Sequence, residues 1–298
     1  MKVARVPIVS VFLCLILAVP AFAAVPVVVS RACDAANLCQ VLISQSCALG
    51  TGCFAGDAPG FPVTITTPGY YRLVSNLKTE SPNDTLIAVT ANDVTLDLGG
   101  FAIGGPTTCT EYSFDCSPTG SGIGIEAGQV ENLAIMNGTI RGMGSDGVDA
   151  GSSAKVTGLR VIENGGEGMG LGSHSVVTDC LVIRNRLNGI LTGAFSLVTG
   201  TSSTHNGLNG IYAAEWSLVA GCTASTNQLN GIATGCACSV RQNNASANGQ
   251  DGINSGGNMA IVDNTAVENH EYGISYGSGV QERNLTVGNG MDGVCGGP

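Results

Sequence analysis

The sequence predicts an all-β protein, a right-handed parallel β-helix of about nine coils of ~21 residues with a Cys-rich N-terminal cap. Two observations carry this prediction. An internal period of 21 residues places β-branched residues at fixed offsets, and the chain combines 44 Gly with only 11% charged residues. Helical repeats need units of roughly 33–47 residues, and propeller blades need about 40. Two or three short strands joined by tight turns fit the shorter unit.

The period is marked by an Asn, then a Gly four residues later, then an apolar residue. The asparagines are Asn164, Asn185, Asn206, Asn227, Asn248, Asn269 and Asn289; the glycines are Gly168, Gly189, Gly210, Gly231, Gly252, Gly273 and Gly293. Stacked coils place equivalent side chains ~4.8 Å apart. We therefore expect inward ladders of Ile and Val, an Asn ladder with hydrogen bonds along the axis, and glycines that supply positive-φ turns.

Residues 1–23 are predicted to be a secretory signal peptide. Lys2 and Arg5 precede an apolar run, and Ala21-Phe22-Ala23 supplies small residues at a cleavage site. No later apolar segment approaches the ~18 residues of a membrane span. The sequence therefore predicts a secreted or periplasmic protein without membrane insertion.

Residues 24–60 form a Cys-rich segment that we expect to cover the first coil, because an open coil exposes strand edges. An oxidising compartment favours disulfides. The spacing suggests local pairs among the first four cysteines and a pair across a later loop; the candidates are Cys33, Cys39, Cys47, Cys53, Cys109 and Cys116. Zinc sites need short Cys or His spacings. Cys236-Ala-Cys238 has no nearby His, so no metal site is predicted.

The β-helix is predicted over residues 61–298. Residues 61–104 contain the first alternating strands, including 63–65, 70–73 and 92–103, and residues 107–118 form a loop. The 21-residue coils follow. The last one ends at Gly296-Gly297-Pro298 in mid-coil, which leaves end-to-end self-association open.

Net charge excludes two classes of partner. The chain carries 12 basic and 22 acidic residues, a formal charge of −10. Nucleic acid binding needs a basic surface that displaces counterions from phosphates. Anionic lipid likewise attracts basic segments. Neither partner is therefore expected.

Three segments carry a family resemblance. Residues 65–73 (ITTPGYYRL), 94–101 (VTLDLGGF) and 137–142 (NGTIRG) resemble those of secreted bacterial right-handed β-helix repeat proteins of the pectate-lyase-like superfamily. The resemblance spans about residues 61–298. It implies kinship with pectate lyases, polygalacturonases, mannuronan epimerases, phage tailspikes and adhesins. The Asp-Pro-His-Asp motif of the epimerases and the Gly-His-Gly motif of the polygalacturonases are not found in the sequence.

Stacking assembles one acid–base–cation set. Equivalent positions of three successive coils carry Glu163, Arg184 and His205, and a second offset carries Asp146 and Glu167. Cleaving or epimerising an acidic glycan needs a base and a cation, and glycoside hydrolysis needs two carboxyls. A solvated charge ladder is the alternative interpretation. Acidic residues also attract Ca²⁺, but no calcium motif is present, so no cofactor is predicted and calcium stays open.

A third offset carries His174, Phe195 and Trp216, the one Trp of the chain. Aromatic rings commonly serve as sugar platforms, and packing is the alternative. The favoured function is interaction with extracellular or cell-surface carbohydrate. The alternatives are a polysaccharide lyase, epimerase or hydrolase acting on acidic glycans, and a structural, adhesin-type surface protein without catalysis. Whether the protein is an enzyme stays open.

Overall fold

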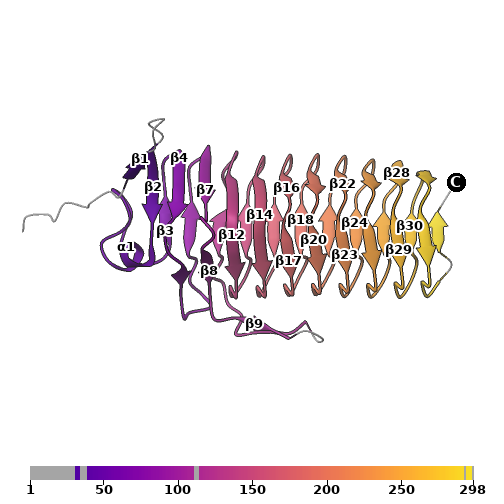
Figure 1. The fold of residues 1–298 in the computed structure, drawn as a ribbon, viewed down its shortest axis with the longest axis horizontal. Helices are drawn as coiled ribbons and strands as arrows, with labels where there is room; N and C mark the ends of the chain where they lie inside the picture. Colours follow the sequence, from indigo (N-terminus) through magenta and orange to yellow (C-terminus); the bar gives the residue numbers. More distant parts are fainter. Residues whose placement is uncertain (1–30, 34–38, 111–113, 292, 297–298) are drawn as a thin grey trace, which may run out of the picture.

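The chain forms a rod of stacked coils (Figure 1). The computed structural model describes residues 31–33, 39–110, 114–291 and 293–296. The predicted signal peptide, residues 1–23, lies outside the described residues. Each regular coil contributes three short strands, one to each of three faces of the rod, here called faces 1, 2 and 3; the strands pair in parallel from coil to coil, which confirms the predicted parallel β-helix.

Face 1 is an 11-stranded sheet, so the rod has eleven coils rather than about nine. Its strands are β3 (Val63–Ile65), β6 (Ile87–Val89), β11 (Ile125–Ala127), β13 (Val148–Ala150), β15 (Met169–Leu171), β18 (Ile190–Thr192), β21 (Ile211–Ala213), β24 (Ile232–Thr234), β27 (Ile253–Ser255), β30 (Ile274–Tyr276) and β33 (Val294–Gly296). The predicted number of coils is too low because β3 and β6 begin coils that are longer than 21 residues and lack the Asn–Gly signature.

Faces 2 and 3 are joined through two long strands that bend from one to the other, β12 (Ala134–Arg141) and β14 (Lys155–Ile162). The other strands of face 2 are β4 (Gly69–Leu73), β7 (Val94–Asp97), β16 (Val176–Thr178), β19 (Leu197–Thr199), β22 (Leu218–Ala220), β25 (Ser239–Arg241), β28 (Met259–Val262) and β31 (Gly279–Glu282). Those of face 3 are β5 (Leu77–Lys78), β8 (Ala102–Gly104), β17 (Leu181–Ile183), β20 (Ser202–Thr204), β23 (Thr223–Ser225), β26 (Asn244–Ser246), β29 (Thr265–Val267) and β32 (Leu285–Val287).

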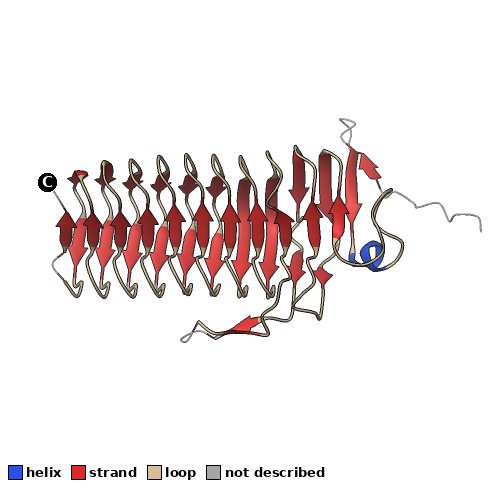
Figure 2. Cartoon of the chain, turned by 180° about the vertical axis from the view of Figure 1, so that it is seen from behind, coloured by secondary structure: helices blue, strands red, loops and turns tan. Residues whose placement is uncertain are grey.

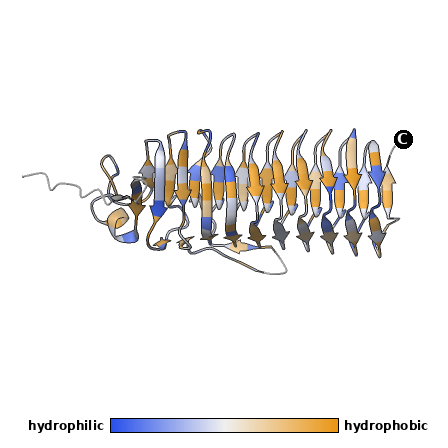
Figure 3. Ribbon diagram, turned by 45° about the horizontal axis from the view of Figure 1, so that its top comes forward, coloured by the Kyte–Doolittle hydropathy of each residue, from blue (hydrophilic) through white to orange (hydrophobic). Residues whose placement is uncertain are grey.

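The core consists of the predicted ladders. On face 1, Ile190, Ile211, Ile232 and Ile253 are in register from coil to coil and fully buried. Figure 3 shows apolar strand segments, in orange, that recur along the rod. The apolar side chains of each coil therefore pack against those of the coil before it and the coil after it.

The Asn ladder is also confirmed. The backbone N–H and Nδ2 of Asn185 both donate to Oδ1 of Asn206 at 3.0 Å, and Asn206 repeats this with Asn227. All three side chains are buried. The row satisfies backbone donors that the turn would otherwise leave unpaired.

The expected role of the recurrent glycines is wrong. None of the seven recurrent glycines, Gly168 to Gly293, has a positive φ. Most residues of the described chain that do adopt positive φ are not glycines. A Cβ on Gly231 would lie 2.6 Å from Nδ2 of Asn248 and 2.7 Å from the carbonyl oxygen of Gly252. The glycines are needed because the next coil passes too close for a side chain. The ladder asparagines do not adopt the left-handed region either.

The N-terminal end carries β1 (Arg31–Cys33), β2 (Cys39–Ile43) and α1 (Gln45–Leu49) (Figure 1). Strand β2 pairs in parallel with β4, so the sheet of face 2 already begins before residue 61. A disulfide joins Cys47 to Cys53. The backbone register places Cys33 opposite Cys39; their side chains lie outside the described part of the chain.

A hairpin projects from the coil that follows β8 and extends along the rod (Figure 2). It contains β9 (Thr108–Cys109) and β10 (Cys116–Ser117), which pair antiparallel, and the predicted Cys109–Cys116 disulfide closes it. We call residues 105–119 the arm. Five cysteines of the described residues are free: Cys180, Cys222, Cys236, Cys238 and Cys295.

Candidate functional site

The turns between faces carry most of the predicted site residues. All of them adopt left-handed backbone, with φ between 54° and 61°: Glu163, Arg184, His205, His174, Phe195 and Trp216. Positive φ is uncommon for residues other than Gly, Asn and Asp. The turn geometry repeats in each coil, so side chains of one row lie one coil apart and outside the core.

The aromatic row lies at the turn between faces 1 and 2. The rings of His174 and Phe195 are stacked with centroids 5.2 Å apart, and those of Phe195 and Trp216 with centroids 6.4 Å apart. Phe195 is 55% and Trp216 64% exposed. Phe195 has a stacked ring on each side, whereas Trp216 has one on one side only. The next position of the row is Ala237, which has no ring.

The charged row lies at the turn between faces 3 and 1. Arg184 and Glu163 form an ion pair with an Nη2–Oε1 distance of 2.7 Å. His205 follows one coil later but lines a separate depression of about 310 Å³ with Phe114 of the arm. The structure thus joins Glu163 to Arg184 and places His205 beside other residues.

Asp146 and Glu167 belong to a second hydrogen-bonded row, which later coils continue with asparagines. The N–H of Glu167 donates to Oδ1 of Asp146 at 2.7 Å, and Nδ2 of Asn188 donates to Oε1 of Glu167 at 3.2 Å. Oε2 of Glu167 is buried and has no hydrogen-bond partner within the described structure. Burial raises the pKa of Glu167 to about 7 and also raises the pKa of Asp146.

These two carboxyls line a depression of about 440 Å³ on face 1 together with Asp149, whose pKa is also raised by burial. Gly170 lies between Asp149 and Leu191 in the sheet. A protonated and an ionised carboxyl at one site are the groups that glycoside hydrolysis uses. No Lys or Arg is among the residues that line the depression, so the cation that lyase or epimerase chemistry needs is not supplied there.

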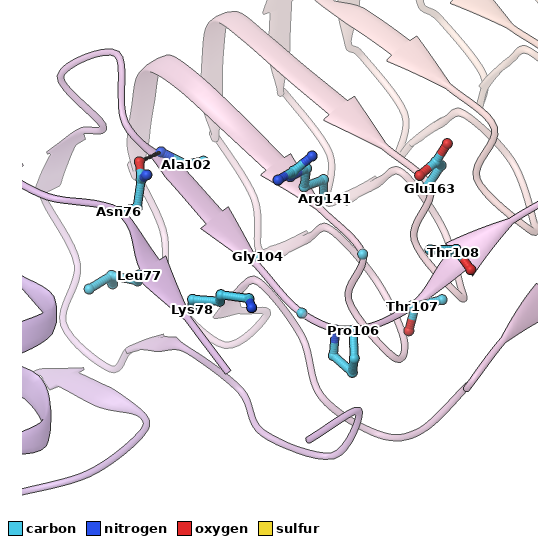
Figure 4. A pocket seen from close by; sticks show the side chains of 12 residues that line it. Asn76, Leu77, Lys78, Ala102, Gly104, Pro106, Thr107, Thr108, Arg141 and Glu163 are labelled. Carbon is cyan, nitrogen blue, oxygen red and sulfur yellow. Dashed lines mark hydrogen bonds between the residues drawn. The ribbon is translucent and has the colours of Figure 1, made fainter. Parts of the chain in front are cut away.

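A pocket of about 260 Å³ lies on face 3 beneath the arm (Figure 4). Lys78 and Arg141 line it, with Glu163 at one end and Thr107 and Thr108 of the arm beside it. Sequence reasoning missed Lys78 and Arg141. The signal was weak because Lys78 precedes the regular period, and only the strand register shows that it shares a row with Arg141.

The described residues also bear on metal binding and on membrane insertion. No group of three or more His, Cys, Asp or Glu side chains is arranged to hold a metal ion. No helix there has the length and apolar character needed to cross a membrane.

No protein-family model and no curated protein matches this sequence. Several solved structures do match its fold. The Dettilon tailspike protein gp208 aligns with a TM-score of 0.56 at 13% identity over 86% of this chain, which spans 61% of the tailspike. The periplasmic alginate epimerase AlgG aligns with a TM-score of 0.53 at 13% identity, over 87% of this chain and 73% of its own.

The A-module of the Azotobacter vinelandii mannuronan C-5 epimerase AlgE6 aligns with a TM-score of 0.52 at 12% identity, over 87% of this chain and 85% of its own. Sequence identities this low support a similarity of fold and nothing further. The coils, their three faces and these likenesses show that the chain is a right-handed parallel β-helix.

Proposed function

We propose that the protein binds a carbohydrate outside the cytoplasm, with Trp216 as the platform. The observation that carries this proposal is the exposed aromatic row, which ends in one uncovered ring face. Two of the solved structures with this fold are named as epimerases of alginate and of mannuronan, which are polysaccharides. Their names support a sugar ligand without identifying it.

The position of the sugar follows from the row. Its rings are stacked at 5.2 and 6.4 Å, and the coil after Trp216 offers Ala237 in place of a ring. A pyranose ring placed over Ala237 would continue the stack and cover the open face of Trp216. The exposed Asn258 of the following coil offers a polar group beyond it.

The test uses the intrinsic fluorescence of the single Trp during titration with neutral and acidic oligosaccharides. Trp216→Ala weakens binding by about tenfold or more, measured by calorimetry, because it removes the apolar ring face that the sugar would cover. Ala237→Phe fills the vacant position at a φ that Phe195 already tolerates, and it removes binding while Trp216 remains. Tyr212→Ala, a partly exposed aromatic of face 1, is the control. Failure to bind any glycan contradicts the proposal.

A second candidate function is hydrolysis of a glycan at the face 1 depression, and the pKa of Glu167 near 7 favours it. Glu167 would act as the proton donor, with Asp146 or Asp149 ionised. Release of reducing ends that is lost in Glu167→Gln and kept in His205→Ala supports this candidate. Product absorbance at ~235 nm, the signature of eliminative cleavage, would instead point to the Glu163–Arg184–His205 row as a lyase site.

We propose that the protein is exported, to the periplasm or the exterior. The Cys47–Cys53 and Cys109–Cys116 disulfides support this proposal because disulfides persist in oxidising compartments. Fusing residues 1–23 to a reporter that folds only after export tests it; a reporter retained in the cytoplasm contradicts it.

End-to-end self-association, with an adhesin-type structural role, is the remaining proposal. The last described coil exposes Val280, Leu285 and Val287, together with the strand edges of β31 and β32. Sedimentation at increasing concentration tests it, and a mass of one chain at every concentration contradicts it.

A further inference from the structure

We infer that the pocket beneath the arm on face 3 binds an oxyanion carried by a sugar, a carboxylate or a sulfate. The inference concerns a site distinct from the aromatic row. Lys78, Gly104 and Arg141 lie directly opposite one another on the adjacent strands β5, β8 and β12. At ~4.8 Å per strand, the two cations stand about 9.6 Å apart at the backbone, with no side chain between them.

Gly104 is not required by the fold. Its φ is not positive, and a Cβ there would meet nothing nearer than the carbonyl oxygen of Arg141 at 3.8 Å. Gly142 differs, because its φ is +66° and a Cβ would lie 2.7 Å from the carbonyl oxygen of Gly105. Gly104 ends β8, and a Gly in a strand often marks a site where a ligand or another stretch of backbone approaches closely. Gly104 keeps the floor of the pocket open between the two cations.

Arg141, Lys78 and Asn76 offer hydrogen-bond donors to the pocket. Arg141 is exposed and has no ion-pair partner among the described residues. Oδ1 of Asn76 accepts from the N–H of Ala102 at 2.9 Å, which leaves its Nδ2 to donate. Figure 4 shows Asn76, Arg141 and Lys78 around the open floor. A ligand that pairs with these donors must carry hydrogen-bond acceptors.

The acids at the rim do not cancel these donors. Glu163 is held by Arg184 at 2.7 Å, and Glu80 is paired with the ammonium of Lys78 at 2.6 Å in an exposed contact. An exposed pair of this kind is worth little and is easily exchanged. Lys78 is thus available to a ligand, and Arg141 offers the planar fork that suits carboxylate and sulfate.

The arm gives the pocket a defined wall. Thr107 donates its N–H to the carbonyl oxygen of Gly142 at 2.9 Å, and its hydroxyl donates to the carbonyl oxygen of Pro118 at 2.5 Å. The Cys109–Cys116 disulfide closes the arm beyond. The volume of about 260 Å³ lies just below the ~300–1,000 Å³ of drug-sized sites. It fits one charged group and the ring that carries it.

The test is calorimetric titration of the full chain with tri-galacturonate, a sulfated trisaccharide, the matching neutral trisaccharide and inorganic sulfate. Short ligands are used because the net charge of −10 repels a long polyanion, and 150 mM NaCl reduces the Debye length to ≈ 8 Å. We expect the two anionic trisaccharides to bind and the neutral one not to bind. Arg141→Gln weakens binding about tenfold, the loss of a charged hydrogen bond.

Two variants complete the design. Gly104→Leu fills the floor and removes binding, with an unchanged circular dichroism spectrum as the folding control. Arg241→Gln, an exposed arginine on face 2 without an ion pair in the described part of the chain, leaves affinity unchanged. Equal losses in Arg141→Gln and Arg241→Gln would overturn the site, as would absence of binding to both anionic trisaccharides. Inorganic sulfate bound as tightly as the sugars would overturn the assignment to a sugar-borne group. Trp216→Ala leaves this binding intact, so the two proposals fail separately.

Discussion

Asn206 shows how a single polar residue is kept inside the rod. Its Oδ1 accepts two hydrogen bonds from Asn185, and its Nδ2 donates to Asn227 at 3.0 Å. The side chain is fully buried. A buried donor that loses its acceptor costs the desolvation of that donor, so each member of the row depends on the next coil.

Asn206→Ala is therefore expected to lower the free energy of unfolding by about 1–3 kcal/mol, because it leaves the backbone N–H of Asn185 without an acceptor and its Nδ2 with only the carbonyl oxygen of Val161, at 3.3 Å. Urea unfolding at constant pH measures this. Thr223→Ala, an exposed position of face 3, is the control and should change stability by less than ~0.5 kcal/mol. A loss in Asn206→Ala no larger than that of the control would show that water replaces the missing acceptor.

The raised pKa of Glu167 should make the free energy of unfolding depend on pH. Burial raises its pKa from 4.5 to about 7, so between these values the folded chain binds more protons than the unfolded chain. Stability then falls as pH rises through that window. For a side chain that is partly exposed, we expect a loss of about 1–2 kcal/mol between pH 5 and 8.

Glu167→Gln keeps an oxygen for Nδ2 of Asn188 and removes the titration. The variant should lose less stability than the parent over the same pH range in urea unfolding. Asp146 and Asp149, whose pKa values are also raised by burial, leave a residual slope of the same sign. Parallel pH profiles for variant and parent would mean that Glu167 does not titrate in this window.

At the scale of the coil, the sequence predicts the ladders well and the turns poorly. The ladders follow from the period, because parallel stacking translates a 21-residue offset into a fixed neighbour. That inference also brings His174, Phe195 and Trp216 together in consecutive coils. The left-handed turn positions are filled by ordinary residues such as Glu163 and Phe195. No propensity marks such positions, since neighbouring coils impose their conformation.

Replacing a glycine of the recurrent row and replacing a glycine of β15 should change stability differently. Gly231→Ala places a Cβ 2.6 Å from Asn248 in the next coil and should cost about 1–3 kcal/mol through overpacking. Gly170→Ala in β15 meets only the carbonyl oxygen of Val148 at 3.9 Å and should be neutral or stabilise by about 0.5 kcal/mol. Thermal and urea unfolding of both variants test this pair. Equal effects would show that the inter-coil spacing adjusts freely.

The arm is the element that sequence could not place. Its disulfide follows from the Cys109 and Cys116 spacing, but residues 105–119 carry no period, and their direction depends on contacts with distant coils. Thr119 lies near Gly165, and Phe114 lies near Gly207. The pocket beneath the arm therefore depends on tertiary packing and strand register rather than on a motif.

Along the rod, the interior side chains of face 3 become smaller toward the last coils, whereas face 1 keeps Ile in its inward column through Ile274. The inward column of face 3 runs from Ile103, Ile140 and Val161 to smaller residues, Ser203, Ala224, Ala245, Ala266 and Thr286. Asparagines also replace apolar residues inside the turn between faces 2 and 3, as in Asn243 and Asn264. Each methylene removed from the interior forfeits ≈ 0.8 kcal/mol of burial.

Stability in such a stack is a sum of coil and interface terms, so it need not be uniform. We expect amide hydrogen exchange to quicken from β14 toward β29. Val161 and Ala266 form a matched pair, since both occupy the same column and both are fully buried, so exposure in the folded state cannot explain a difference. A difference of one to two methylenes per coil amounts to about 1–2 kcal/mol, or roughly tenfold in protection. Uniform protection along the rod would instead mean that all eleven coils open in one cooperative step, and that the hydrogen-bonded ladders outweigh the apolar gradient.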